Sequence, residues 1–434
     1  MKNKLLNRRL MLGLLMFIAV AMLWSGGLWQ AEAAEQVTIK YYCWYPPDPI
    51  MNPLIERFEE LHPNIKVEVN KTEPGPYQQK TPVSLASGEQ MDLVASFTRV
   101  SFVNQIKNFL TPLQPLMDEY HGKGWEQKLV DGVVETCRNY ADDGKLYILG
   151  QGFLGSPVMY YNASLFREYG LTVPETIADL KQAVETVKSK NPDIMPIVFR
   201  GKLPWLHTAS AFGMYAQEKE LWSVARQGKY NTPEMVEMAT WWARLFREDI
   251  ISKDTLDVDN AMAAELFYTG KAVMMIHGTW MAGLLTEDYR QKNDVQIQEI
   301  GAFPFPAITP GNSPTTASTL DLGLGIAKHS KHKKEALELM NFLLFGEGAQ
   351  MMADNFTLVP VKQGLEVKRD MFATDLAREG YERIRTALAN PQNALREFDE
   401  KSTPFGKVLQ SIVLGQEPKE ALDDFQREID MGKY

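Results

Sequence analysis

Residues 37–69 have the sequence VTIKYYCWYPPDPIMNPLIERFEELHPNIKVEV, in which two β-rich runs flank a helical one. The first run, residues 37–44, is rich in β-branched and aromatic residues, which is typical of a strand, and prolines end it. Apolar residues then recur at helical spacing over residues 50–61, and residues 65–69 again have the pattern of a strand. The order strand, helix, strand predicts a crossover helix and therefore a parallel sheet packed on both faces.

The alternation of strands and helices continues along the chain, which predicts an α/β fold. Further strands are predicted at residues 93–96, 195–199 and 271–278. Further helices are predicted at residues 79–87, 177–189, 233–246 and 261–268. A glycine-rich segment, residues 150–155, lies between two strand-like runs at 145–149 and 157–162. We interpret this segment as a joint where the chain crosses from one lobe to another.

The first 34 residues have the order of a secretory signal peptide. Four basic residues precede the uncharged run 10–29, and Ala31-Glu32-Ala33 follows it. We expect cleavage after Ala33 or Ala34, although the apolar run is also long enough for an uncleaved membrane anchor. No cysteine lies near the cleavage site, so the usual lipid attachment is not available, and we expect an exported protein of the periplasm or the outer face of the cytoplasmic membrane.

Charge and cysteine content exclude several partner classes. Without residues 1–34, which carry four Lys/Arg and one Asp/Glu, the chain has 42 basic and 54 acidic residues, a net charge of −12. Such an acidic chain is not expected to bind nucleic acid or anionic membranes. Cys43 and Cys137 allow a disulfide, but a buried free thiol is equally compatible with the strand that holds Cys43. No Cys/His cluster has zinc spacing, and we expect neither a metal nor a cofactor.

Several short phrases follow one another along the chain, and they include Leu85-Ala86-Ser87-Gly88, Asp143-Gly144-Lys145-Leu146-Tyr147, Tyr160-Tyr161-Asn162-Ala163-Ser164-Leu165-Phe166, Gly170-Leu171-Thr172-Val173-Pro174-Glu175-Thr176, Phe267-Tyr268-Thr269-Gly270-Lys271-Ala272-Val273-Met274 and Gly278-Thr279-Trp280. Their order and spacing resemble those of the large extracellular solute-binding protein family that contains the maltose-binding protein. The chain departs from the family pattern at Met91, where proline is common, and at Ile177, where tryptophan is common.

The resemblance implies a periplasmic-binding-protein-like fold, with two doubly wound α/β lobes joined by a hinge and the ligand cleft between them. It implies residues 35–152 and 320–362 in lobe 1, and 153–319 and 363–434 in lobe 2. It also implies a monomeric binding protein that captures a sugar or oligosaccharide and delivers it to the membrane permease of an ABC importer.

Sugars offer flat C–H faces and many hydroxyls, so aromatic and planar polar side chains at strand ends are the candidates for binding. The candidate ligand-binding residues are Trp44, Tyr45, Tyr77, Ser96, Gln151, Phe153, Trp205, His207, His277, Trp280 and Asp321. Structural roles stay open for several of them: Trp44 under its loop, His277 as a satisfied buried histidine, and Asp321 as a turn-stabilising residue.

Other functions have weaker support in the sequence. The pattern Gly150-x-Gly152-x-x-Gly155 matches the dinucleotide fingerprint, but it precedes a β-rich run where that fingerprint requires a helix. A glycoside hydrolase needs two facing carboxyl groups, and no Asp/Glu pair is distinguished by spacing. The same scaffold with a polyamine or a glycerol phosphate is the other alternative, and only Arg99 and Arg200 are placed to bind a phosphate.

Overall fold

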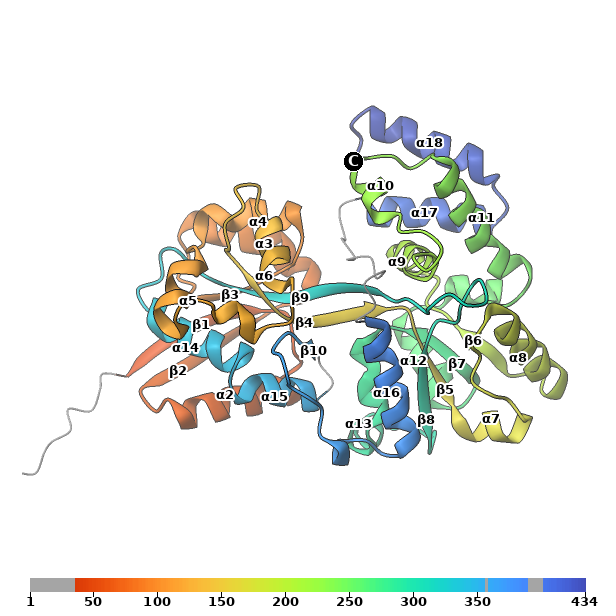
Figure 1. Cartoon of the computed structure of the whole chain (residues 1–434), viewed down its shortest axis with the longest axis horizontal. Coiled ribbons are helices and arrows are strands. Elements are labelled where there is room, and N and C mark those ends of the chain that lie inside the picture. Colours follow the sequence, from red (N-terminus) through yellow and green to blue (C-terminus); the bar gives the residue numbers. More distant parts are fainter. Residues whose placement is uncertain (1–35, 356–357, 389–400) are drawn as a thin grey trace, which may run out of the picture.

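The computed structural model describes residues 36–355, 358–388 and 401–434, so the predicted signal peptide lies outside the described residues. The described chain forms two lobes, each built on its own sheet (Figure 1). One sheet has six strands in the order β10-β4-β9-β3-β1-β2, and the other has four in the order β6-β7-β5-β8. This is the two-lobed α/β architecture that the sequence predicts.

The six-stranded lobe is formed by the first part of the chain and by a later return. Its elements are β1 (Val37–Cys43), α2 (Asp48–Leu61), β2 (Ile65–Lys71), α3 (Pro74–Ser87), β3 (Leu93–Ser96), α4 (Val100–Ile106), η1 (Lys107–Phe109), α5 (Leu113–His121), η2 (Trp125–Lys128), α6 (Val133–Asn139), β4 (Leu149–Ser156), β9 (Ala317–Ile326), α14 (Lys333–Leu344), α15 (Glu347–Asp354) and β10 (Val359–Pro360).

The four-stranded lobe contains the middle and the end of the chain. Its elements are β5 (Val158–Asn162), α7 (Ala163–Tyr169), α8 (Ile177–Lys190), β6 (Met195–Val198), α9 (Pro204–Tyr215), α10 (Trp222–Arg226), α11 (Pro233–Arg247), η3 (Lys253–Asp257), α12 (Asn260–Tyr268), β7 (Ala272–His277), η4 (Thr279–Leu285), α13 (Glu287–Lys292), β8 (Ile300–Pro304), η5 (Arg369–Met371), α16 (Asp375–Leu388), α17 (Ser402–Val413) and α18 (Pro418–Asp430).

The opening unit is the predicted β-α-β crossover. Strands β1 and β2 pair in parallel from Val37↔Ile65 to Cys43↔Lys71, and β3 pairs in parallel with the other edge of β1. Helices α2 and α15 lie on one side of this sheet and α3 and α4 on the other (Figure 1). Helix α2 buries one apolar stripe, which includes Leu54 and Phe58. The apolar residues that recur at helical spacing in the sequence therefore form the buried face of this helix.

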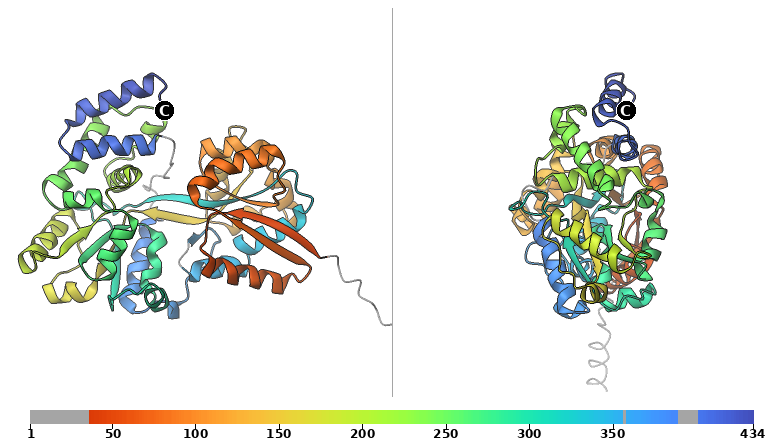
Figure 2. Two further views of the ribbon diagram at one scale, coloured as in Figure 1. Left: turned by 180° about the vertical axis from the view of Figure 1, so that it is seen from behind. Right: turned by 90° about the vertical axis from the view of Figure 1, so that its right-hand side faces the viewer.

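Strands β4 and β9 connect the two lobes. They pair antiparallel from Leu149↔Leu324 to Ser156↔Ala317, and both extend from the six-stranded sheet toward the other lobe (Figures 1 and 2). The predicted crossing at residues 150–155 is confirmed, but its predicted conformation is wrong. Residues 145–148 are not a strand, and the glycine-rich segment itself lies within β4.

Glycine is needed in β4 because a neighbouring strand approaches it closely. A Cβ on Gly152 would lie 2.6 Å from Cβ of Leu358 and 2.7 Å from the carbonyl oxygen of Val359. Strand β10 pairs with β4 at this point, Pro360 opposite Gly152. The glycines of this segment therefore reflect close backbone approach, which a sequence pattern does not separate from a flexible joint.

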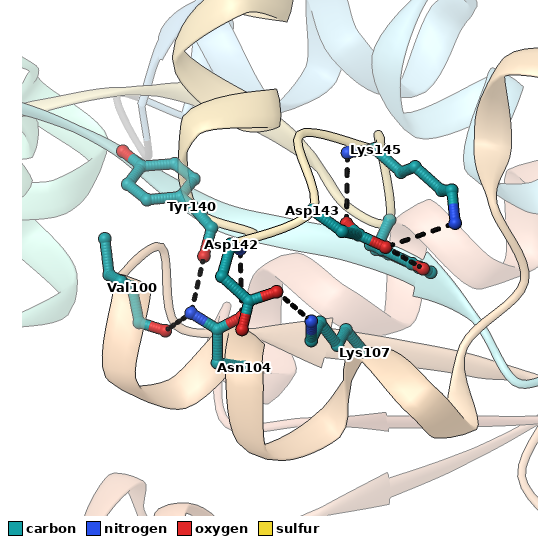
Figure 3. Close-up of polar contacts among 8 residues, drawn as sticks. Val100, Asn104, Lys107, Tyr140, Asp142, Asp143 and Lys145 are labelled. Carbon is teal, nitrogen blue, oxygen red and sulfur yellow. Dashed lines mark hydrogen bonds and ion pairs between the residues drawn. The ribbon is translucent and has the colours of Figure 1, made fainter.

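The turn that leads into β4 is held by polar contacts to α4 (Figure 3). The side-chain amide of Asn104 donates to the Tyr140 carbonyl at 3.4 Å, and its oxygen accepts from the backbone N–H of Asp142 at 3.1 Å. Asp143 accepts from the backbone N–H of Lys145 at 3.1 Å, across a turn that needs a glycine with φ of 67° at residue 144. The Asp143-Gly144-Lys145 phrase is therefore structural.

Both cysteines are free and buried. Cys43 lies in β1 and Cys137 in α6, and burial raises the pKa of each thiol to about 12. The structure therefore has two unreactive core thiols where the sequence left a disulfide open.

Helix α9 packs directly on the two crossing strands. A Cβ added to Gly213 would lie 2.8 Å from Cβ of Ala317 and 2.9 Å from the carbonyl oxygen of Ser156. These contacts involve backbone at the end of both crossing strands, so no side-chain rotation relieves them. Gly213 therefore sets the distance between α9 and the connection of the lobes.

We predict that Gly213→Ala lowers the free energy of unfolding by about 1–3 kcal/mol, the usual cost of overpacking a rigid site. Chemical denaturation followed by circular dichroism measures it. The matched control is Gly75→Ala in α3, where an added Cβ has no heavy atom within 4 Å. That variant needs no neighbouring atom to move, so its free energy of unfolding should change by less than about 1 kcal/mol. Equal destabilisation by both substitutions would contradict this account of Gly213.

Candidate functional site

A cavity of 590 Å³ lies between the lobes, beside the crossing strands. This volume is typical of small-molecule sites, which are concave and lined by apolar groups with a few polar ones. Residues from both lobes and from both crossing strands line it. They are Trp44, Tyr45, Pro74, Phe97, Thr98, Arg99, Leu154, Arg200, Trp205, Asn260, Trp280, Thr319, Asp321, Leu322, Ser402 and Thr403.

The six-stranded lobe contributes an aromatic wall to the cavity. Trp44 follows the last residue of β1 and stacks on Phe97, with ring centroids 4.1 Å apart and an interplanar angle of 10°. Tyr77 packs behind Trp44 at 5.0 Å. Burial and then the charge of Asp321 raise the pKa of Tyr45, so its hydroxyl stays neutral and can donate a hydrogen bond. Trp44 and Tyr45, which the strand-end rule selected, both line the cavity, and their role in ligand binding stays a prediction.

The four-stranded lobe contributes two tryptophans and an arginine. Trp205 lies in the first turn of α9, and Trp280 follows β7 in η4. The guanidinium carbon of Arg200 lies 5.8 Å from the centre of the Trp280 ring. Trp205 and Trp280 both line the cavity, and their contact with a ligand stays a prediction. Trp205 belongs to a helix and not to the irregular segment that the sequence indicated.

Strand β9 contributes two polar residues to the cavity. Asp321 and Thr319 both line it, and residues at i and i+2 of a strand share a face. Asp321 also accepts a hydrogen bond from the backbone N–H of Leu322 at 2.7 Å. The two readings of Asp321, cavity residue and backbone-stabilising residue, therefore both describe it.

Three predicted site residues support the cavity wall from behind and do not line it. Tyr77 is buried and its hydroxyl donates to the Ala95 carbonyl at 2.6 Å, while the Ser96 hydroxyl donates to the Phe97 carbonyl at 3.0 Å. His277 is buried next to Trp280 and accepts from the Gly278 N–H at 2.9 Å. Placing these three side chains in the cleft was wrong, because each satisfies a backbone group in the wall.

Two predicted residues of the glycine-rich strand face away from the cavity. Phe153 and Leu154 are neighbours in β4, so their side chains point to opposite faces. Leu154 lines the interlobe cavity, whereas Phe153 lines a second cavity of 670 Å³ next to β10 and α16. Gln151 is buried within the six-stranded lobe and does not line the interlobe cavity. Phe153 and Gln151 were therefore assigned to the wrong face.

His207 is a core residue. It is fully buried, its Nε2 donates to the Gly201 carbonyl at 2.8 Å, and its Nδ1 accepts from Trp242 at 3.2 Å. Its ring also packs against Phe199. Because helix α9 points Trp205 into the cavity, the side chain two positions later lies on another face of the helix. The prediction of His207 as a ligand contact was therefore wrong.

Sequence reasoning missed several lining residues. Phe97, Leu154, Asn260, Thr319, Ser402 and Thr403 belong to this set. Phe97 follows β3, so the strand-end rule could have found it. Ser402 and Thr403 come from the start of α17, far along the chain, and no local pattern connects them to the cleft.

Among the described residues no three His, Cys, Asp or Glu side chains are close enough to hold a metal ion. Within the same residues, no helix has the length and apolar character needed to cross a bilayer.

We predict that His207 makes the protein less stable as the pH falls from about 6.5 to 4. Burial lowers the pKa of His207 to about 4, so the unfolded chain, with a histidine pKa near 6.5, binds the proton first. Between pH 7 and pH 5 the wild type should lose about 2 kcal/mol more than His207→Gln. Urea unfolding at both pH values measures this, with exposed His329→Gln as the control. Parallel losses in all three proteins would contradict the prediction.

A family model described as bacterial extracellular solute-binding protein matches residues 45–350 of the chain. The melibiose/raffinose/stachyose-binding protein MelE of Bacillus subtilis is 25% identical over 261 residues, and the match covers 57% of each chain. The multiple sugar-binding protein of Streptococcus mutans is 24% identical over 343 residues, which cover 74% of each chain.

Solved structures share the fold over most of the chain. The substrate-binding protein Lmo0181 from Listeria monocytogenes in complex with cycloalternan has a TM-score of 0.72 and 18% identity, covering 92% of this chain and 100% of that one. RafE from Streptococcus pneumoniae has a TM-score of 0.70 and 19% identity, covering 91% and 97%. Both likenesses support the predicted two-lobed fold. The family model spans well over half of the sequence, and the chain therefore belongs to the bacterial extracellular solute-binding protein family.

Proposed function

We propose that this protein captures a sugar or oligosaccharide outside the cytoplasmic membrane and delivers it to the permease of an ABC importer. The observation that carries this proposal is the interlobe cavity, with Trp44 on one wall and Trp205 and Trp280 on the other. Aromatic rings match the flat C–H faces of pyranose rings, and the hydroxyls need polar partners such as Asp321 and Thr319.

The relatives support a carbohydrate ligand. MelE is named for binding melibiose, raffinose and stachyose, and RafE has been solved in complex with raffinose. The second relative is named a multiple sugar-binding protein. Transfer of this ligand class rests on the aromatic walls of the cavity, because identities near 25% do not preserve individual contacts.

We place the lobe boundaries at residues 35–152 with 320–362, and 153–319 with 363–434. The separate hydrophobic clusters of the described residues support this division, since one contains Ile39 to Leu149 and Leu320 to Val361. A ligand that contacts both walls stabilises the closed arrangement by the contacts it makes only there. The permease would recognise that closed form.

Binding without catalysis is the proposed role, and the cavity lining supports it. Among the described lining residues Asp321 is the single carboxylate, whereas glycoside hydrolysis uses two carboxyl groups about 5–9.5 Å apart. We propose a monomer that is exported to the periplasm or the outer face of the membrane and works without a metal or a cofactor. An importer receptor must release its ligand, so we expect a Kd near 1 μM, about −8 kcal/mol.

Two other ligand classes fit the lining less well. A polyamine would require several carboxylates, but Arg99 and Arg200 outnumber Asp321 among the charged lining residues. A glycerol phosphate would use the arginines, yet it would leave the aromatic walls without a partner. A thermal-shift screen with saccharides, polyamines and glycerol phosphates separates these classes, because a ligand at about 100 times its Kd adds about 2.7 kcal/mol of stability.

We predict that Trp280→Ala lowers the affinity for the saccharide found in this screen by tenfold or more, which corresponds to about 1.4 kcal/mol. Trp280→Phe should lose less, because a smaller ring still stacks. Isothermal titration calorimetry measures both, and the ligand should be recovered unchanged. The control is Trp241→Phe, which alters a buried tryptophan that does not line the cavity. If Trp280→Ala bound the saccharide as tightly as the wild type, stacking of the ligand on Trp280 would be ruled out.

A further inference from the structure

Arg200 is the buried cation of the interlobe cavity. It follows β6, lines the cavity, and has a relative exposure of only 3%. Burial lowers the pKa of Arg200 to about 9, so the guanidinium remains charged at neutral pH. A buried charge is costly unless a counter-charge or good hydrogen bonds compensate it.

Most of the hydrogen-bond donors of Arg200 have no partner among the described residues. Its Nη1 donates to the side-chain oxygen of Asn260 at 2.9 Å. Its Nε is buried without a hydrogen-bond partner, and within the described residues Arg200 forms no ion pair with a carboxylate. Nε and Nη2 form the edge of a guanidinium that binds a carboxylate through two parallel hydrogen bonds. The contact with Asn260 through Nη1 leaves this edge without a hydrogen-bond partner among the described residues, although Nε itself is buried.

The described residues around Arg200 do not supply a negative charge. Asn260 is neutral, and the guanidinium lies 5.8 Å from the Trp280 ring. The neighbouring His277 is held neutral, because burial and then the charge of Arg200 lower its pKa well below the usual value. Asp321 is the single carboxylate among the described lining residues, against the two arginines Arg99 and Arg200. Among the described lining residues, arginines therefore outnumber carboxylates.

We propose that the ligand is an acidic saccharide whose carboxylate is bound by Arg200 while a sugar ring stacks on Trp280. This inference rests on the proposed sugar-binding function and narrows its substrate class to uronic acids and oligosaccharides that contain them. The carboxylate would replace the missing counter-charge of Arg200. Discrimination against neutral sugars follows, because a neutral ligand leaves the buried guanidinium edge unpaired.

The charge balance favours a carboxylate over a phosphate. A sugar carboxylate carries one negative charge, which matches the single charge of the Arg200 guanidinium, whereas a phosphate monoester carries close to two at neutral pH. Asp321 lines the same cavity and would repel the second charge. The planar carboxylate also fits the available guanidinium edge through two hydrogen bonds.

The test measures matched pairs of neutral and acidic ligands by isothermal titration calorimetry. Neutral di- and trisaccharides are compared with their uronic acid counterparts and with their 6-phosphates on the purified protein. The wild type should bind the uronic acid member at least tenfold more tightly than the neutral one, and Arg200→Gln should abolish this preference. Arg200→Lys keeps the positive charge but cannot form two parallel hydrogen bonds, so it should retain only part of the preference for the uronic acid ligand.

The matched control is Arg290→Gln. Arg290 is also a buried arginine of the four-stranded lobe, but it lies in α13 and does not line the cavity, so its variant should keep the wild-type preference. Equal affinity of the wild type for neutral and uronic acid ligands would overturn the inference and leave sugar binding intact. Preference for the 6-phosphates would overturn the carboxylate assignment. Absence of binding to every saccharide would overturn the proposed function itself.

Discussion

The antiparallel pairing of β4 with β9 is the constraint on which the rest of this molecule depends. These strands belong to the six-stranded sheet, yet their far ends, at Ser156 and Ala317, lead into the other lobe. Because strand side chains alternate, the same ladder separates two cavities, with Leu154 facing the interlobe cavity and Phe153 facing the other. The backbone that joins the lobes therefore also forms the floor of the binding cavity.

The ladder is interrupted once, and the interruption lies at the cavity. Gly150 pairs with Gly323 and Gly152 with Asp321, but Leu322 has a positive φ of 49°. A left-handed conformation costs a leucine about 1–2 kcal/mol. The Leu322 N–H turns to the carboxylate of Asp321 instead of completing the ladder. The Asp321 carboxylate, which lines the cavity, is thus held by the strained residue next to it, and this contact links the cavity to the strand connecting the lobes.

Sequence patterns predicted the fold better than they predicted the site. Hydrophobic periodicity correctly located the β-α-β opening. The strand-end rule selected Trp44, Tyr45 and Trp280, which all line the interlobe cavity. The sequence patterns failed at Ser96 and His277, whose side chains form hydrogen bonds with backbone groups of the cavity wall. A polar residue that binds a ligand and one that binds a backbone group have the same local sequence. Thr403 reaches the cavity only through tertiary packing of α17, which local patterns do not contain.

The aromatic residues and the arginine of the cavity differ in what they can discriminate. Stacking on Trp44 or Trp280 is available to any sugar ring, since it depends on surface more than on hydrogen-bond geometry, so the aromatic residues would provide affinity for the proposed class of ligand. Selection within the class needs a buried polar group that is left without a hydrogen-bond partner when the wrong ligand binds. Arg200 is such a group, because it is buried and charged in the described structure, and only one of its nitrogens has a hydrogen-bond partner there. Its position on the wall opposite Trp44 means that a ligand satisfying both residues must touch both lobes, so recognition and closure would draw on the same contacts.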